Sequence, residues 1–125
     1  MSASFRWGDL LVWAQDEAGD ASTEAARRAV VSRAYYACYH ECLARAQRQM
    51  FTRAQFPGMG SHEALAAWCT MRPEAAWRAT GKMLRTLKNR RHHADYNIRP
   101  LTADDMVEHV TLAADFIHAQ MVLLP

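Results

Sequence analysis

The segment SRAYYACYHECLARA, residues 32–46, has apolar or aromatic side chains around most of the circumference of a helix. A helix with this composition is typical of an element that is surrounded by others. The segment belongs to a run without Pro or Gly that begins after Ser22, a good N-cap residue, and ends near Gln49. We therefore expect one long central helix with the remaining elements packed around it.

Four further helices are predicted from capping residues and chain breaks. They cover residues 7–17, 61–69 with Ser61 as the cap, 73–97 with Pro73 in the first turn, and the region that follows Thr102. The loop FPGMG at residues 56–60 separates the long helix from the third one. No stretch alternates apolar and polar residues as a strand does. The sequence therefore predicts an all-α fold, an antiparallel up-and-down four-helix bundle with an additional short helix.

Length and composition limit the class of protein. The chain has 125 residues, of which 50% are hydrophobic and 22% charged, as expected for a single domain over residues 1–125. No apolar run approaches the roughly 20 residues that a membrane-spanning helix needs, so we predict a cytoplasmic protein without a membrane contact. Cys38, Cys42 and Cys69 are interpreted as small core residues in a reducing compartment, and no cofactor is expected.

The positive charge is concentrated in one stretch of the chain. Residues 75–94 contain no Asp or Glu, whereas their basic side chains are Arg78, Lys82, Arg85, Lys88, Arg90 and Arg91. Such a basic element is the electrostatic pattern expected for a phosphate-rich or acidic partner. A solvated helix face is the alternative interpretation.

Within this stretch, the segment LKNRRHHADYN at residues 87–97 mixes two helix faces. At about 100° per residue, Arg91 falls on the apolar stripe that includes Leu84 and Leu87, whereas His92 and His93 point away from it. A partly buried guanidinium needs a partner, and Asp95 lies four residues later on the same side. Arg85 also points away from the stripe, and Lys88 and Arg90 flank it on opposite sides. The pattern predicts either a helix-end ion pair or a functional arginine.

Polar side chains also gather on one side of the long helix. Arg33, Tyr36 and His40 fall within a third of its circumference, and each needs a partner if it is buried. We expect this side to face Arg91, either inside the bundle or at a subunit interface. An isolated His40 that is hydrogen-bonded in the core is the alternative.

These segments together resemble the HEPN domain, a small all-helical domain of prokaryotes and higher eukaryotes. The resemblance covers residues 25–119 and includes the closing segment LAADFIHA at residues 112–119. It is carried by Arg33, Tyr35, Tyr36, His40, Arg91, Ala94, Asp95 and Tyr96.

The resemblance implies a helical bundle that pairs as a homodimer and, in many members, a metal-independent ribonuclease. Those nucleases share an Arg, four to six residues and a His, and the motifs of two subunits meet in a cleft at the interface. Many are toxins encoded beside a minimal nucleotidyltransferase antitoxin. Arg91 matches the motif arginine, but Tyr96 stands where the catalytic histidine would be.

The candidate catalytic residues follow from the chemistry of RNA cleavage without a metal, which needs a base, an acid and a cation beside the phosphate. Arg91, paired with Asp95, would supply the cation, His92 or His93 a group that titrates near neutral pH, and Tyr96 a proton donor or phosphate ligand. The candidate contacts to RNA or nucleotide are Arg33, Tyr36, His40, Arg85, Lys88, Arg90 and His93. No metal site is predicted, because adjacent helical residues diverge too far to share an ion.

Two hypotheses result from these observations. The first is the toxin-like component of a toxin–antitoxin pair, a dimeric ribonuclease with a degenerate motif in which Arg91 is followed by four residues and Tyr96. The second is a non-catalytic HEPN module that binds RNA, a nucleotide or a nucleotidyltransferase partner through the same basic surface.

Overall fold

A computed structural model of the protein describes residues 5–125, and every regular element in this range is helical. The α-helices are α1 (Trp7–Asp20), α2 (Glu24–Arg48), α3 (Ser61–Thr70), α4 (Ala75–Tyr96) and α5 (Ala103–Asp115). Short elements are the 3-10 turns η1 (Arg53–Gln55) and η3 (Met121–Leu123) and the π-helical turn η2 (Phe116–Gln120). The predicted all-α class and the five predicted α-helices are confirmed for the described residues.

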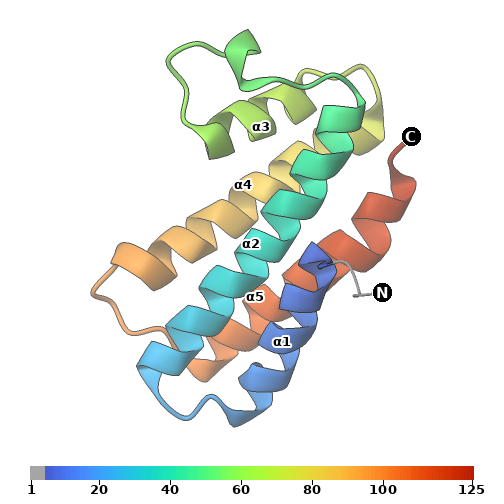
Figure 1. Ribbon diagram of the computed structural model, residues 1–125. Helices are drawn as coiled ribbons and strands as arrows, with labels where there is room; N and C mark the ends of the chain where they lie inside the picture. The colour runs from blue at the N-terminus through green and yellow to red at the C-terminus, as the bar shows by residue number, and fades with distance from the viewer. Residues whose placement is uncertain (1–4) are drawn as a thin grey trace.

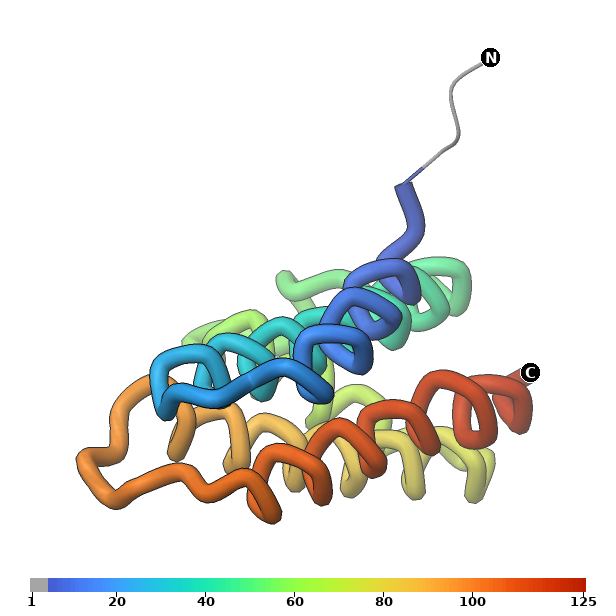
Figure 2. Tube along the Cα trace, turned by 90° about the horizontal axis from the view of Figure 1, so that it is seen from below, coloured from blue at the N-terminus to red at the C-terminus, as the bar shows by residue number. Residues whose placement is uncertain are grey.

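The long helix α2 is the centre of the arrangement, because it packs against each of the other four α-helices. In Figure 1, α1 and α4 run in the opposite direction to α2 and α5. Figure 2 shows α4 and α5 side by side in one layer, with α1 and α2 in the layer next to it. The short helix α3 packs mainly on α4.

The capping residues explain where the helices begin. The side chain of Thr23 accepts a hydrogen bond from the Ala26 backbone N–H at 3.1 Å, so the N-cap of α2 is Thr23, one residue after the cap expected at Ser22. Thr102 and Asp105 form the predicted capping box at the start of α5. The cap expected at Ser61 is wrong, because Gly60 occupies the N-cap position of α3 and gives no side-chain bond.

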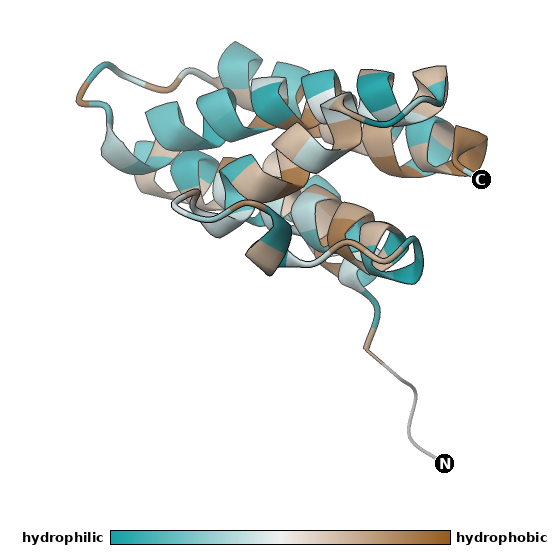
Figure 3. Ribbon diagram, turned by 90° about the horizontal axis from the view of Figure 1, so that it is seen from above, coloured by the Kyte–Doolittle hydropathy of each residue, from teal (hydrophilic) through white to brown (hydrophobic). Residues whose placement is uncertain are grey.

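Close packing at two points fixes α3 against its neighbours. A Cβ atom on Gly81 would lie 2.6 Å from Cγ2 of Thr70, so only glycine allows α3 and α4 to approach this closely. The Sγ atoms of Cys42 on α2 and Cys69 on α3 are 3.7 Å apart in the core. All three cysteines are buried and none forms a disulfide within the described residues, as expected of small core residues. Figure 3 shows polar residues mainly on the outer sides of the helices.

The end of α4 is tied to the beginning of α2 by Arg28. Its guanidinium donates hydrogen bonds to the carbonyl oxygens of His93, Ala94 and Arg99 at 2.8–3.0 Å. These carbonyls lie at the C-terminal end of α4 and just beyond it, where backbone partners run out; the His93 carbonyl still accepts the Asn97 backbone N–H at 3.1 Å. This clamp sets the position of the last turns of α4, which carry Arg91.

None of the helices in residues 5–125 is both long enough and apolar enough to span a membrane.

Candidate anion-binding site

Arg91 lies between α4 and α2 with its guanidinium against two aromatic rings. Its Cζ atom is 5.4 Å from the ring centroid of Tyr35 and 5.6 Å from that of Tyr36. A guanidinium this close to aromatic rings is held by a cation–π interaction. Only 13% of the Arg91 side chain is exposed, so the partly buried arginine predicted from the apolar stripe of α4 is confirmed.

The charge of Arg91 is only partly compensated. Its Nη1 atom is 3.4 Å from Oδ2 of Asp95, which confirms the predicted pair one helical turn apart. Oδ2 of Asp95 also accepts a long hydrogen bond, 3.5 Å, from the Ser32 hydroxyl. The Nε atom of Arg91 is buried and has no hydrogen-bond partner among the described residues. The guanidinium therefore keeps an unused donor while its orientation is fixed.

A surface cleft of about 410 Å³ lies next to this ion pair, between α2 and α4. The residues that line this α2–α4 cleft are Arg28, Ala29, Ser32, Arg33, Tyr36, Ala94 and Asp95. Arg28 and Arg33 bring two positive charges to a wall that contains the Asp95 carboxylate, and Arg28 also pairs with Glu24 at 3.7 Å. Tyr36 contacts Arg91, as the sequence predicts, whereas Arg33 is exposed and faces the cleft. The cleft can attract a small anion or a phosphate group.

His62, in the first turn of α3, is a neighbour of Arg91 that the sequence analysis missed. The Tyr35 hydroxyl and Nδ1 of His62 are 2.6 Å apart. Burial raises the pKa of Tyr35, so its phenol stays protonated and can donate this hydrogen bond. Burial, followed by the charges of Arg91 and Lys88, lowers the pKa of His62 to about 4. His62 is therefore a neutral imidazole at pH 7.

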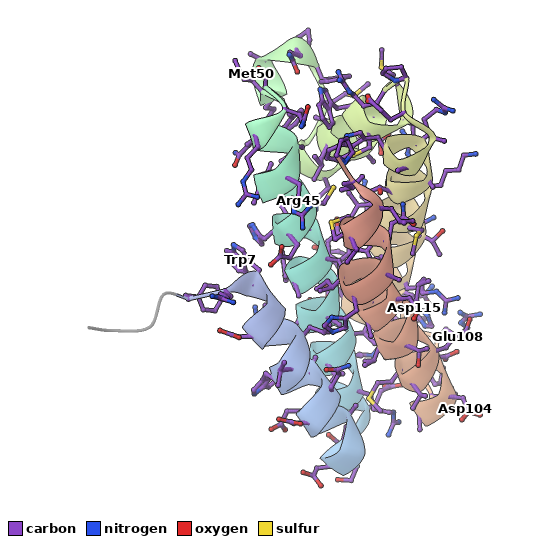
Figure 4. All side chains as sticks on the ribbon, turned by 90° about the vertical axis from the view of Figure 1, so that its right-hand side faces the viewer. Trp7, Arg45, Met50, Asp104, Glu108 and Asp115 are labelled. Carbon is purple, nitrogen blue, oxygen red and sulfur yellow. The ribbon has the colours of Figure 1, made fainter. Side chains whose placement is uncertain are left out.

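His40 lies on α2, one helical turn after Tyr36, and its ring is close to other aromatic rings. Its ring is 3.7 Å from the ring of Trp7 and nearly parallel to it, at 12°. Figure 4 shows Trp7 at the start of α1, beside α2. Tyr36 is 6.3 Å from His40 between ring centroids, and burial lowers the pKa of His40. His40 is thus covered by α1, and its closest ring partner is Trp7.

The other two candidate catalytic residues lie on the outer face of α4. The rings of His92 and Tyr96 are 4.8 Å apart, and 67% of Tyr96 is exposed. Together with Asn97 and Ile98 they line a separate depression of about 290 Å³. We call the surface formed by these four residues the outer face. Residues 91 and 96 are about 140° apart around a helix at about 100° per residue. One chain therefore divides the candidate catalytic residues between two surfaces.

The basic side chains around the site are mostly engaged in ion pairs. Glu63 of α3 lies 3.1 Å from Arg85 and 3.7 Å from Lys88, so Arg85 faces α3 instead of pointing away from the bundle. Arg90 pairs with Glu108 of α5 at 2.5 Å. Figure 4 shows Glu108 with Asp104 and Asp115 along α5. Lys88 and Arg90 thus flank the stripe on opposite sides, as predicted, but carboxylates neutralise much of the basic stretch.

His93 is directed to the junction between α4 and α5. Its Nε2 atom is 3.1 Å from the carbonyl oxygen of Arg99, and the Arg99 guanidinium is 3.3 Å from its Nδ1 atom. His93 therefore contributes to the chain reversal after α4.

The described residues hold no cluster of three or more His, Cys, Asp or Glu side chains that could bind a metal ion. In comparisons with known proteins, no family model, no curated protein and no solved structure matches the chain. The assignment of a function therefore depends on the motifs of the sequence and on the geometry of the α2–α4 cleft.

Proposed function

We propose that this chain is a HEPN-type helical module that binds RNA through a phosphate group in the α2–α4 cleft. The family assignment rests on the motifs of α2 and α4. The observation that carries the proposed binding is the Arg91 guanidinium, which is fixed against two tyrosine rings beside a cleft that Arg28 and Arg33 also line.

Arg91 is well prepared for a phosphate ligand. A guanidinium offers several N–H donors in one plane and matches the oxygens of a phosphate better than a lysine does. Because Arg91 is held by Tyr35, Tyr36 and Asp95 before any ligand arrives, binding orders few additional side-chain torsions. Arg85, Lys88 and Arg90 are each paired with a carboxylate, so they compete less strongly for an anionic ligand than the exposed Arg33 does.

A toxin-type ribonuclease is the second candidate function. It is favoured by the exposure of the His92–Tyr96 pair, which leaves both rings accessible to another molecule. Cleavage without a metal needs a proton-transfer group beside the phosphate. Because His92 and Tyr96 lie on the outer face, they can reach a phosphate at Arg91 only from a second copy of the chain. The ribonuclease candidate therefore includes a homodimer, and it also includes a nucleotidyltransferase antitoxin as a partner.

The binding module is placed first because the Arg91 guanidinium, its two tyrosine rings and the α2–α4 cleft all lie within one chain. The test compares wild-type protein with Arg91→Gln, Arg33→Gln and, as a matched control, Arg48→Gln, since Arg48 is an exposed arginine at the far end of α2. Binding of a fluorescein-labelled oligouridylate is measured by polarisation over a range of salt concentrations, after circular dichroism has shown that each variant is folded.

We expect salt-sensitive binding by the wild type, clear loss with Arg91→Gln, a smaller loss with Arg33→Gln and no loss with Arg48→Gln. Equal binding by wild type and Arg91→Gln would contradict the proposal. In a parallel RNA-cleavage assay with EDTA, we expect the RNA to stay intact if the protein is a binding module. Cleavage that disappears with Arg91 would instead establish the ribonuclease.

A further inference from the structure

His62, the histidine beside Arg91, does not belong to the sequence motifs of α2 and α4. We propose that His62 is a second phosphate-binding group of the Arg91 site, and that its imidazole takes up a proton when phosphate binds. This inference rests on the proposed binding of RNA phosphate at Arg91. It assigns to α3 a residue that contacts the ligand, in addition to the residues on α2 and α4.

His62 and Arg91 approach the same two rings from different helices. The His62 ring is 5.4 Å from Tyr35 and 6.4 Å from Tyr36 between ring centroids, and its nearest ring is Tyr39 at 4.2 Å. The Arg91 Cζ atom is 5.4 Å from the Tyr35 centroid and 5.6 Å from that of Tyr36. Tyr35 therefore has the guanidinium of α4 and the imidazole of α3 as immediate neighbours. One phosphate group, or two adjacent ones, can be bound by both.

The hydrogen bond from Tyr35 determines which nitrogen of His62 is available. Because the phenol is protonated, its O–H donates to Nδ1, and the neutral imidazole then carries its own proton on Nε2. Nε2 takes no part in this bond, so its N–H is the donor that His62 can offer to a phosphate oxygen.

The charges around His62 explain why protonation awaits a ligand. The titratable or charged groups that face it are Arg91, Lys88 and Arg85 on α4, Glu63 on α3, and Tyr35, Tyr36, Tyr39 and His40 on α2. Glu63 is shared by Arg85 and Lys88, so its charge is already compensated. The N-terminus of α3 adds a partial positive charge, which further disfavours an imidazolium.

A phosphate group would reverse this balance. Its negative charge would offset Arg91 and Lys88 and would accept a hydrogen bond from each imidazole N–H that faces it. The added proton would occupy Nδ1, so the Tyr35 O–H would turn away and its oxygen would accept the hydrogen bond from Nδ1. The pKa of His62 would then be higher in the complex than in the free protein. Linkage requires that binding becomes tighter as the pH falls, because the bound state holds more protons than the free state.

The experiment is isothermal titration calorimetry of an oligouridylate into the whole protein near pH 6, in two buffers with different ionisation enthalpies. The difference between the two observed enthalpies gives the number of protons taken up. We expect proton uptake by the wild type, none by His62→Gln, and unchanged uptake by His118→Gln, which replaces an exposed histidine of η2. As the pH falls, the affinity for the oligouridylate should rise by up to about tenfold for each unit by which binding raises the pKa of His62.

A direct measurement avoids any dependence on how His62→Gln folds. Nuclear magnetic resonance of the histidine rings in wild-type protein gives the pKa of His62 with and without the oligouridylate, and we expect a higher value in the complex. The same pKa in both states, or equal proton uptake by wild type and His62→Gln, would overturn the inference. Either of these results leaves the proposed function intact as long as Arg91→Gln still weakens binding. RNA binding that does not depend on Arg91 would contradict both the inference and the proposed function.

Discussion

The inner site around Arg91 and the outer face around Tyr96 come from the same two turns of α4 but differ in burial and in the contacts of their side chains. The inner arginine is held by rings of α2 and by a carboxylate, and most of its side chain is buried. The outer tyrosine contacts His92 and is 67% exposed. Residues that form one motif in the sequence therefore belong to two surfaces, and their roles can be separated by experiment.

The largest difference is expected in stability, from truncation of one tyrosine on each side. Tyr35 is fully buried, so Tyr35→Ala should lower the free energy of unfolding by about 3–5 kcal/mol through lost packing and an empty cavity. Tyr96→Ala should change it by less than about 0.5 kcal/mol, as usual for exposed positions. Urea denaturation of both variants measures the two values. Similar losses would show that the outer face is packed in solution.

Acid should distinguish interior histidines from exposed ones. His109 on α5 is buried, neither of its ring nitrogens has a hydrogen-bond partner among the described residues, and burial followed by Arg90 lowers its pKa to about 4. The Val31 carbonyl partly opposes this lowering, although it makes no hydrogen bond of ordinary geometry.

The sign of the pH effect follows from this lowered pKa. The unfolded chain binds a proton at this histidine near pH 6.5, whereas the folded protein resists it until about pH 4. Stability should be constant above about pH 6.5 and fall by about 3 kcal/mol from this group as the pH approaches 4. Urea denaturation across this range should give a flatter profile for His109→Leu than for wild type, and the wild-type profile for His92→Gln. Parallel profiles for wild type and His109→Leu would contradict the assignment.

Adjacent arginines offer a sharper comparison for RNA binding. Arg91→Gln should weaken binding of the oligouridylate by about tenfold, or about 1.4 kcal/mol, because it removes the fixed cation beside the cleft. Arg90→Gln should weaken it by less than about threefold, since Arg90 already pairs with Glu108 on the other side of α4. Polarisation titrations at one salt concentration measure both. Equal losses would place the RNA across α4 and not in the α2–α4 cleft.

The smallest effect is expected for Tyr96→Phe, which removes one exposed hydroxyl. It should leave RNA affinity and stability unchanged within error, whereas Tyr35→Phe should cost about 1–3 kcal/mol of stability by leaving Nδ1 of His62 without its donor. Thermal denaturation of the two matched variants measures the difference. A loss of RNA affinity with Tyr96→Phe alone would favour a site shared between two copies.

The helices could be predicted from the sequence because their signals are local. The run without Pro or Gly in α2 and the capping box at Thr102 each act within one or two turns. The pair of Arg91 and Asp95 was predictable for the same reason, since residues four apart share a helix face.

Contacts between distant segments could not be predicted in this way. His62 reaches Tyr35 only because α3 packs on α4, and Trp7 reaches His40 only because α1 packs on α2. The π-helical turn in residues 116–120 is similar, because it places Gln120, whose amide donates hydrogen bonds to the Ala76 carbonyl and the Thr80 hydroxyl of α4. These arrangements depend on how helices meet, which capping residues and periodicity do not encode.

The clamp formed by Arg28 limits how the cleft can recognise its ligand. Its N–H groups already serve three carbonyl oxygens at the end of α4, so an anion could take them only by uncapping that helix. Arg28 therefore acts on a ligand through its charge at a distance and leaves directional contacts to Arg91 and Arg33. A ligand that did withdraw Arg28 would loosen the turn between α4 and α5, and the amide hydrogens of residues 97–101 would exchange faster with solvent in the complex than in the free protein.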